Sequence, residues 1–322
     1  MAISRRAEAT ASAPRSFASR LLDTRKVRRI ANDRVLYLML LPFFVYFIVF
    51  HYVPLLGNVV AFKRFSPARG IIDSPWVGLS YFGQFLSSTN FWRVLRNTVA
   101  ISLSTLIVGF PAPIILALML NEVHSKAYKR VVQSVTYLPH FVSLVVVAGL
   151  IVQFSSMQGL FNDIIVAFGG RRVPLLQQAR LFVPIYVASE VWQTVGWGSI
   201  IYLSALSTID PNLYEAAEID GAGRFKQLFA ITLPSLIPTI TVLFILRTGT
   251  LLSVGHEKII LLYNPLIYER ADVIMTFVYR RGLIDLNWSY STAVGLLNSI
   301  VNAFIIVGTN AVSRRVSETS LW

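Results

Sequence analysis

The chain has 322 residues, of which 55% are hydrophobic and only 14% charged, and its formal net charge is +13. A soluble protein carries about a quarter charged residues, so this composition excludes an ordinary water-soluble globular domain. Cysteine is absent, which excludes disulfides and thiolate metal sites. The positive charge is concentrated ahead of the first apolar run, where anionic lipid is a sufficient partner, and nucleic-acid binding is not expected.

Residues 1–34 form a basic tail, with nine Arg or Lys residues against three acids. The tail contains few large apolar residues, and we predict that it is disordered. The positive-inside rule places it in the cytoplasm. The apolar run that follows is too long for a signal-peptide core and precedes no small-residue cleavage pattern, so we expect a permanent membrane anchor.

Six apolar stretches follow the tail, each of about the 20 residues that a helix needs to cross the hydrocarbon core of a bilayer. Helices are favoured because they satisfy their own backbone hydrogen bonds in lipid, and the alternation typical of an outer-membrane barrel is missing. The sequence therefore predicts an all-α polytopic membrane protein, with one transmembrane domain over 35–322 and both termini in the cytoplasm. The predicted spans are 35–56, 98–120, 131–154, 181–206, 233–254 and 293–312.

The connections between the spans are too short for separate domains. The first contains six aromatic residues between Trp76 and Trp92, which form either short amphipathic helices on the lipid surface or, as we expect, an aromatic belt at the interface. Residues 271–284 predict a helix in the last connection. Asn298 and Asn302 lie one turn apart in the sixth span and are expected to make interhelical hydrogen bonds.

The connection 207–232 is the most informative part of the chain. Asp210 is followed by proline, which is typical of a helix start with Asp as the N-cap. Glu215 lies in the first turns, where the helix dipole favours negative charge, and Gly221 permits a turn out of the helix. A second amphipathic stretch then leads to Leu233, where the fifth span is predicted to begin. On spacing alone, an ordinary interfacial helix explains this segment equally well.

The full string resembles the coupling-loop signature of ABC-importer permeases: a Glu-Ala-Ala triplet, an Asp-Gly-Ala turn and an Ile-x-Leu-Pro sequence. The resemblance implies that the short helix inserts into a cleft on a separate ATPase subunit. Glu215 would then pair with a basic residue of the ATPase, and Ala216 and Ala217 would pack in its cleft. Asp220 and Gly221 would form the bend after the helix.

Further strings extend the resemblance over nearly the whole chain after residue 34. They are similar to the subfamily that imports oligosaccharides, and within it to alginate-importer permeases. The implied cargo is an oligosaccharide, with an acidic, alginate-like oligosaccharide as the finer expectation. The strings are 51–54, 74–79, 91–98, 110–113, 138–141, 195–199, 262–265 and the terminal Leu321-Trp322.

The resemblance also implies a type I importer permease fold and transport by alternating access. The expected partners are a second permease in a heterodimer, two ATPase subunits and an extracytoplasmic solute-binding protein at the bacterial inner membrane. The sequence has no phosphate loop, so we predict that the chain is not an enzyme and that the partner ATPase binds ATP and Mg²⁺. We expect no cofactor and no metal site in the chain itself.

Ionisable residues inside spans are costly and mark candidate functional sites. Glu190 and Arg247 lie in the two spans that flank the coupling segment, and Arg247 could hold the carboxylate of an acidic sugar. Aromatic faces, amides and hydroxyls nearby are suited to sugar rings and hydroxyls. The alternatives are a structural Glu190–Arg247 ion pair or an Arg247 that snorkels to the interface. The substrate-path candidates are Glu190, Trp192, Gln193, Trp197, Arg247, Thr250 and Ser253.

Two other functions are weighed against the importer: a secondary transporter, and a membrane scaffold or sensor that transports nothing. Secondary transporters usually show internal repeats and broken helices around a midplane ion site, and the sequence predicts neither. Neither alternative explains the string from Glu215 to Pro234.

Overall fold

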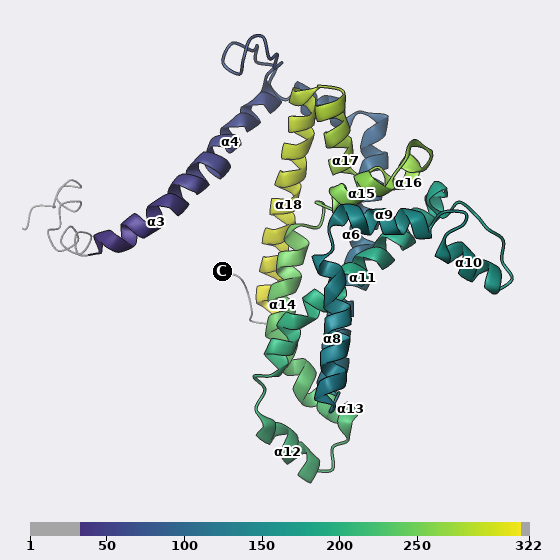
Figure 1. Cartoon of the computed structure of the whole chain (residues 1–322). Coiled ribbons are helices and arrows are strands. Elements are labelled where there is room, and N and C mark those ends of the chain that lie inside the picture. The colour runs from purple at the N-terminus through teal and green to yellow at the C-terminus, as the bar shows by residue number, and fades with distance from the viewer. Residues whose placement is uncertain (1–32, 317–322) are drawn as a thin grey trace, which may run out of the picture. The chain divides into compact units, whose positions relative to one another are not determined.

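The computed structural model describes residues 33–316, most of which are helical (Figure 1). The chain divides into two units, one ending at Gly57 and the other beginning at Asn58. The prediction of a disordered tail falls almost entirely on residues 1–32, and it lies outside the described residues, as does the terminal Leu321-Trp322.

The first unit contains a helical stretch whose apolar side chains are exposed on every side. The predicted first span, 35–56, is helical throughout, with a π-helical turn ahead of Pro54 that accommodates its missing N–H. None of its helical residues is buried, and a helix that is apolar all round requires lipid or another protein around it. The elements are α3 (Arg34–Phe47), η1 (Ile48–Tyr52) and α4 (Val53–Leu56), and η2 (Gly57–Phe62) follows.

The frame of the second unit consists of α6 (Thr89–Gly109), α7 (Pro111–Asn121), α8 (Lys126–Phe141), α9 (Leu144–Phe154), α11 (Ala179–Leu206), α14 (Leu233–Gly249) and α18 (Trp288–Val316). Helix α11 packs against α6, α7 and α8, while α14 runs alongside α18 (Figure 1).

The second span begins earlier than the predicted 98–120. Its helix starts at Thr89, where the side chain of Ser88 accepts a hydrogen bond from the N–H of Phe91.

Glycines allow α11 to approach its neighbours closely. A Cβ atom at Gly196 would lie 2.1 Å from the carbonyl oxygen of Thr136 in α8, and one at Gly198 would lie 2.9 Å from Pro113 in α7. Small residues at helix contacts are typical of membrane bundles, because they let two backbones meet. The Gly-Trp-Gly-Ser string at 196–199 is therefore explained in part by packing.

The predicted third span, 131–154, is not one straight helix. Helices α8 and α9 meet at a bend of 100°, and such a pair is either one broken span or a re-entrant loop. Val142 is extended, and Ser143 begins the second helix by accepting a hydrogen bond from the N–H of Val146 at 3.4 Å. The apolar character continues through the bend, so hydropathy alone could not reveal it.

The predicted fifth span, 233–254, is shifted towards the N-terminus. The helical run begins at Arg224 and ends at Gly249, so the expected restart at Leu233 is absent. The run passes from α13 (Arg224–Gln227) through a π-helical turn, η4 (Leu228–Thr232), into α14, and the wider turn accommodates Pro234 without a break.

The chain leaves the helix after Gly249 and is held by Asn302 of α18. The Asn302 side chain accepts a hydrogen bond from the N–H of Leu252 and donates one to the hydroxyl of Ser253, both at 3.0 Å. Asn302 therefore binds the turn after α14 rather than a helix, whereas Asn298 makes the predicted interhelical contact by donating a long hydrogen bond to the sulfur of Met275 in α17, at 3.8 Å.

Among residues 33–316, four helical stretches are long and apolar enough to cross a membrane, and the bent pair would make a fifth. Helix α11 has 28 residues but is not among them, because polar residues such as Glu190 and Gln193 lower its hydropathy. The predicted count of six spans remains a prediction.

The aromatic residues of the first connection lie in a core rather than on a lipid surface. Phe85, in α5 (Ser80–Leu86), is 1% exposed, and its ring centroid lies 5.2 Å from that of Phe91 and 5.9 Å from that of Phe277. The interface position therefore fits only the exposed members, Trp76 and Trp92. Hydropathy could not separate the buried aromatic residues from the exposed ones, because Phe277, which packs against Phe85, lies 192 residues further along the chain.

Asp272 links the start of α6 to the last connection. Its buried carboxylate pairs with Arg93 at 3.1 Å and with Arg280 at 2.7 Å, and its carbonyl accepts from the side chain of Asn97 at 3.0 Å. The predicted helix 271–284 begins three residues late, because Asp272 must be extended to reach both arginines. The elements are η5 (Pro265–Ile267), α16 (Tyr268–Ala271), α17 (Ile274–Tyr279) and η6 (Arg280–Ile284).

The contact at Gly196 gives the first testable prediction. Gly196→Ala should destabilise the protein by about 1–3 kcal/mol, because the methyl group would force α8 and α11 apart. Thermal unfolding in detergent measures this. The control is Gly149→Ala in α9, where nothing lies within 4 Å of the added atom and about 0.5–1 kcal/mol of stabilisation is expected. A Gly196→Ala protein as stable as wild type would contradict the packing argument.

Candidate functional site

The predicted coupling segment forms the expected short helix, α12 (Pro211–Ile219). Asp210 is its N-cap and accepts a hydrogen bond from the N–H of Asn212 at 3.0 Å. The chain turns at Gly221, whose φ of +72° lies in the left-handed region that favours glycine. The predicted cap and bend are therefore both present.

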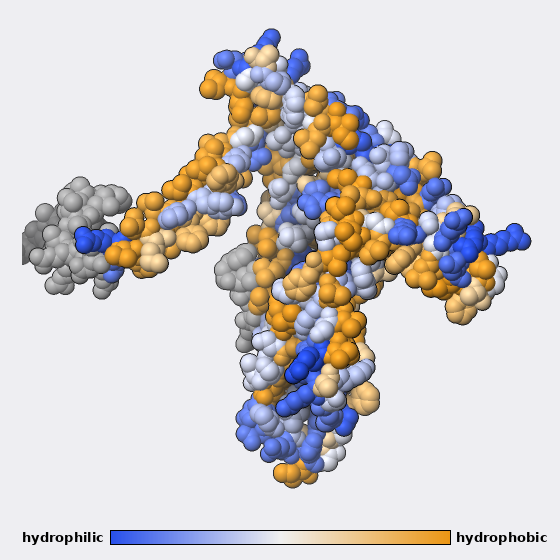
Figure 2. Space-filling view, viewed as in Figure 1, coloured by the Kyte–Doolittle hydropathy of each residue, from blue (hydrophilic) through white to orange (hydrophobic). Residues whose placement is uncertain are grey.

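Helix α12 is exposed along its length at one end of the second unit (Figure 1). Hydrophilic residues gather at this end, while apolar residues are plentiful on the helices above it (Figure 2). Large apolar side chains interrupt the polar surface: Ile219 is 87% exposed, Phe225 is 81% exposed and Leu213 is 50% exposed. Glu215 and Ala216 are exposed as well. Exposed apolar residues rimmed by polar ones are typical of a protein-binding surface.

A hydrogen bond that the sequence did not predict fastens α12 to the long helix. The hydroxyls of Tyr214 and Thr232 lie 3.0 Å apart, and Thr232 is buried in the π-helical turn η4. The Gln227 side chain also donates to the carbonyl of Ala222 at 3.1 Å. Because η4 continues into α14, this hydrogen bond connects α12 directly to the helix that carries Arg247.

Arg247 lies in a cavity of about 220 Å³ formed by α6, α11, α14 and the turn that follows α14. The predicted Glu190, Thr250 and Ser253 line the same cavity, so the structure brings four of the seven candidates together. Its further lining residues, which the sequence analysis did not single out, are Ser102, Thr105, Tyr186, Leu251, Val254 and Gly255.

Glu190 pairs with Lys258 rather than with Arg247, so the alternative of a structural Glu190–Arg247 ion pair is excluded. Lys258 belongs to α15 (His256–Leu262), and its ammonium lies 3.2 Å from the Glu190 carboxylate and 3.2 Å from the side-chain oxygen of Gln193. Its side chain is only 2% exposed. Burial lowers the pKa of Lys258, and the charge of Glu190 opposes that effect.

Lys258 was missed because it lies just outside the predicted spans. The charged pair Glu257-Lys258 ahead of the apolar run Ile259–Leu262 was the available signal, since a lysine so placed is seldom fully buried without a partner.

Arg247 forms no ion pair with any of the residues from 33 to 316, although it lies at the same cavity as a glutamate. Its carbonyl accepts a hydrogen bond from the hydroxyl of Thr250 at 3.2 Å. The cavity is therefore lined by one cationic residue, Arg247, without an acidic partner among the described residues, because Glu190 is paired with Lys258.

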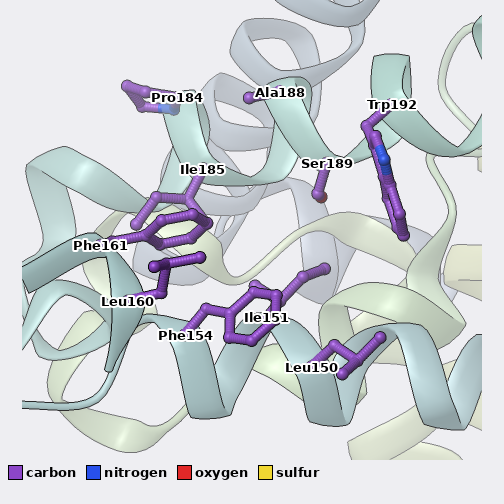
Figure 3. A pocket seen from close by; sticks show the side chains of 10 residues that line it. All are labelled: Leu150, Ile151, Phe154, Leu160, Phe161, Pro184, Ile185, Ala188, Ser189 and Trp192. Carbon is purple, nitrogen blue, oxygen red and sulfur yellow. The ribbon is translucent and has the colours of Figure 1, made fainter. Parts of the chain in front are cut away.

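The other three candidates lie elsewhere. Gln193 is engaged with Lys258, and the indole of Trp197 stacks on His140 of α8 with ring centroids 4.7 Å apart. Trp192 lines a separate apolar pocket of about 510 Å³ between α9, α10 (Leu160–Ala167) and α11, with Leu150 on the facing wall (Figure 3). Neither Trp192 nor Trp197 lines the Arg247 cavity, so their rings would not stack there on a sugar, as the sequence predicted.

An exposed short helix joined to a bundle of apolar helices with an open, charged cavity suits a membrane transport subunit, and comparison with known proteins agrees. Residues 109–318 match the family described as the binding-protein-dependent transport system inner membrane component. Protein LplB of Bacillus subtilis is 42% identical, over 91% of this chain and 92% of that protein. The polygalacturonan/rhamnogalacturonan transport system permease protein YteP of the same organism is 40% identical, over 91% and 92%.

Solved structures agree as well. A bacterial ABC transporter involved in the import of the acidic polysaccharide alginate is similar, with a TM-score of 0.85 and 44% identity. The match covers 91% of this chain and 99% of that chain. A second structure of a bacterial alginate ABC transporter, in complex with an alginate pentasaccharide-bound periplasmic protein, gives a TM-score of 0.85 and 43% identity over the same shares.

The chain belongs to the family of binding-protein-dependent transport system inner membrane components, the permease subunits of ABC importers. The predicted type I importer permease fold and the prediction that the chain is not an enzyme are confirmed by this membership. The secondary-transporter and scaffold alternatives are set aside.

The hydrogen bond between Tyr214 and Thr232 gives a prediction that is independent of any partner. Tyr214→Phe removes one hydroxyl and should loosen α12, since a hydrogen bond contributes about 0.5–1.5 kcal/mol. Amide hydrogen exchange within Pro211–Ile219 should become roughly two- to twelvefold faster. Thr208→Ala is the control, because that hydroxyl donates only to the carbonyl of Ala205 in its own turn. Equal exchange in both variants would contradict the role of the tether.

Proposed function

We propose that the chain is the permease subunit of an importer of acidic oligosaccharides, driven by ATP and working by alternating access. The observation that carries this proposal is the charge of the cavity: Arg247 faces it without an acidic partner among the described residues, while Glu190 is neutralised by Lys258. A guanidinium presents paired donors that suit a carboxylate, and it is the group that a uronic sugar would select.

The remaining lining residues suit a carbohydrate. Thr250, Ser253 and Ser102 supply hydroxyls, and Tyr186 supplies a ring beside them. Sugar hydroxyls are bound by such groups. The relatives point the same way, since one is described as a polygalacturonan/rhamnogalacturonan permease and two similar structures are of alginate transporters.

The partners follow from the exposed surfaces. Helix α12 offers Glu215, Ala216 and Ala217, with the bend at Asp220 and Gly221, to a cleft on an ATPase subunit that would bind ATP and Mg²⁺. Helix α3 has no buried residue, and lipid together with a second permease, forming a heterodimer, would cover it. The family is binding-protein dependent, so a solute-binding protein would deliver the cargo at the opposite end from α12.

The same arrangement sets the orientation in the bacterial inner membrane. An ATPase is cytoplasmic, so α12 would face the cytoplasm, and the basic tail at 1–34 would lie on that side by the positive-inside rule. ATP-driven closure of the two ATPases would move α12, and α14 would carry that movement to Arg247.

Docking on the ATPase is tested by charge reversal. Glu215→Arg should abolish copurification of the ATPase subunits with the permease, because a basic residue in their cleft would be repelled. Glu269→Arg in α16 is the control, since this exposed glutamate lies at the other end of the unit (Figure 1). Retention of the ATPase by Glu215→Arg would exclude the proposed contact.

The cargo is tested at Arg247. Arg247→Met should lower uptake of a uronic oligosaccharide by at least about tenfold, the size expected for a lost hydrogen bond to a charged group. Uptake of a neutral oligosaccharide should change much less, and the complex should still assemble. Arg180→Met, an exposed arginine at the start of α11, controls for the loss of one positive charge. Unchanged uronate uptake by reconstituted Arg247→Met complexes would remove Arg247 from the site.

A further inference from the structure

We infer that Lys258 determines the charge selectivity of this cavity, because it occupies Glu190 and so leaves Arg247 free to bind a carboxylated sugar. The inference rests on the proposed function and adds to it a specificity-determining residue that does not itself line the cavity. Lys258 acts through Glu190 and is a positioning residue.

The geometry places Lys258 behind the cavity wall. Its ammonium is 3.2 Å from the Glu190 carboxylate, which lines the cavity, and 3.2 Å from Gln193, which does not. The Tyr186 ring lies 5.6 Å from the same ammonium and faces the cavity. Lys258 therefore contacts three residues of α11 and does not itself line the cavity.

The charge count of the cavity depends on this contact. The charged lining residues are Glu190 and Arg247, which sum to zero by themselves. With Lys258 included, the sum is +1. The result is the same if the buried proton passes from Lys258 to Glu190, since the pair is then two neutral groups. The cavity thus stays selective for anions in either protonation arrangement of the pair.

Removal of Lys258 should weaken the selectivity for anions through the two charged residues that remain. Glu190 would keep its charge and become the counter-ion of Arg247, and an incoming carboxylate would have to displace it. At the short separations and intermediate dielectric of a partly buried site, one unit charge changes binding by on the order of tenfold or more.

The experiment measures the ratio of uptake of a uronic trisaccharide to that of a neutral trisaccharide in proteoliposomes. These contain the full complex with its ATPases, second permease and binding protein. The binding protein is the same in every sample, so its own preference cancels when variants are compared. Lys258→Gln should lower the ratio by on the order of tenfold, and Lys258→Arg should keep it. The double variant Glu190→Gln/Lys258→Gln should restore the wild-type ratio, because Arg247 is again alone.

Arg280→Gln is the matched control, because it breaks a different buried ion pair, with Asp272, that does not line the cavity. Its uptake ratio should equal that of wild type. Where Lys258→Gln does not assemble, Lys258→His replaces it, and its uptake ratio relative to wild type should fall as the pH rises and the imidazole loses its charge. A relative ratio that does not change with pH overturns the inference, as does a double variant with a lowered ratio.

The proposed function and the inference about Lys258 are overturned by different results. A wild-type complex without preference for the uronic trisaccharide overturns the acidic cargo and the inference together. A wild-type preference that is unchanged in Lys258→Gln overturns the inference alone and leaves the proposed function standing.

Discussion

The ion pair between Glu190 and Lys258 is the interaction on which the interior of this protein depends. A glutamate within a membrane helix is costly unless it is paired, and Lys258 supplies the pair from a short helix that lies outside the long spans. The contact links α15 to α11 through a glutamate that lines the cavity. It also separates two charges that the sequence alone would join, Glu190 and Arg247. The chemistry of the cavity is therefore set by a residue that does not line it.

The second constraint is mechanical continuity. The helical run from Arg224 to Gly249 extends from the foot of α12 to the cavity without a break, since a π-helical turn absorbs Pro234. Tyr214 and Thr232 join α12 to the start of this run. One rod therefore connects the exposed docking surface with Arg247 near its far end. Rigid secondary-structure elements of this kind can carry coupling between two distant sites.

The end opposite α12 is rigid for a different reason. Asp272 is fully buried between Arg93 and Arg280, and each of these arginines keeps one nitrogen without a hydrogen-bond partner among the described residues. The aromatic core around Phe85 draws on α5, α6, α17 and α18, and thus includes the helix that carries Arg93. Segments far apart in the sequence are thus joined twice, by charge and by packing. In the proposed importer, this end would receive the solute-binding protein.

The sequence by itself determined the class of protein, the α12 helix with its cap and bend, and the residues Glu190 and Arg247, because hydropathy, capping and buried charge are local properties. It determined the cavity only in part, since Trp192, Gln193 and Trp197 proved to face other surroundings. Tertiary structure alone decided the 100° bend after Pro139, the start of the fifth helix at Arg224 and the partner of Glu190. The physical reason is distance along the chain: a lysine 68 residues away can neutralise a glutamate only once the fold has brought them together.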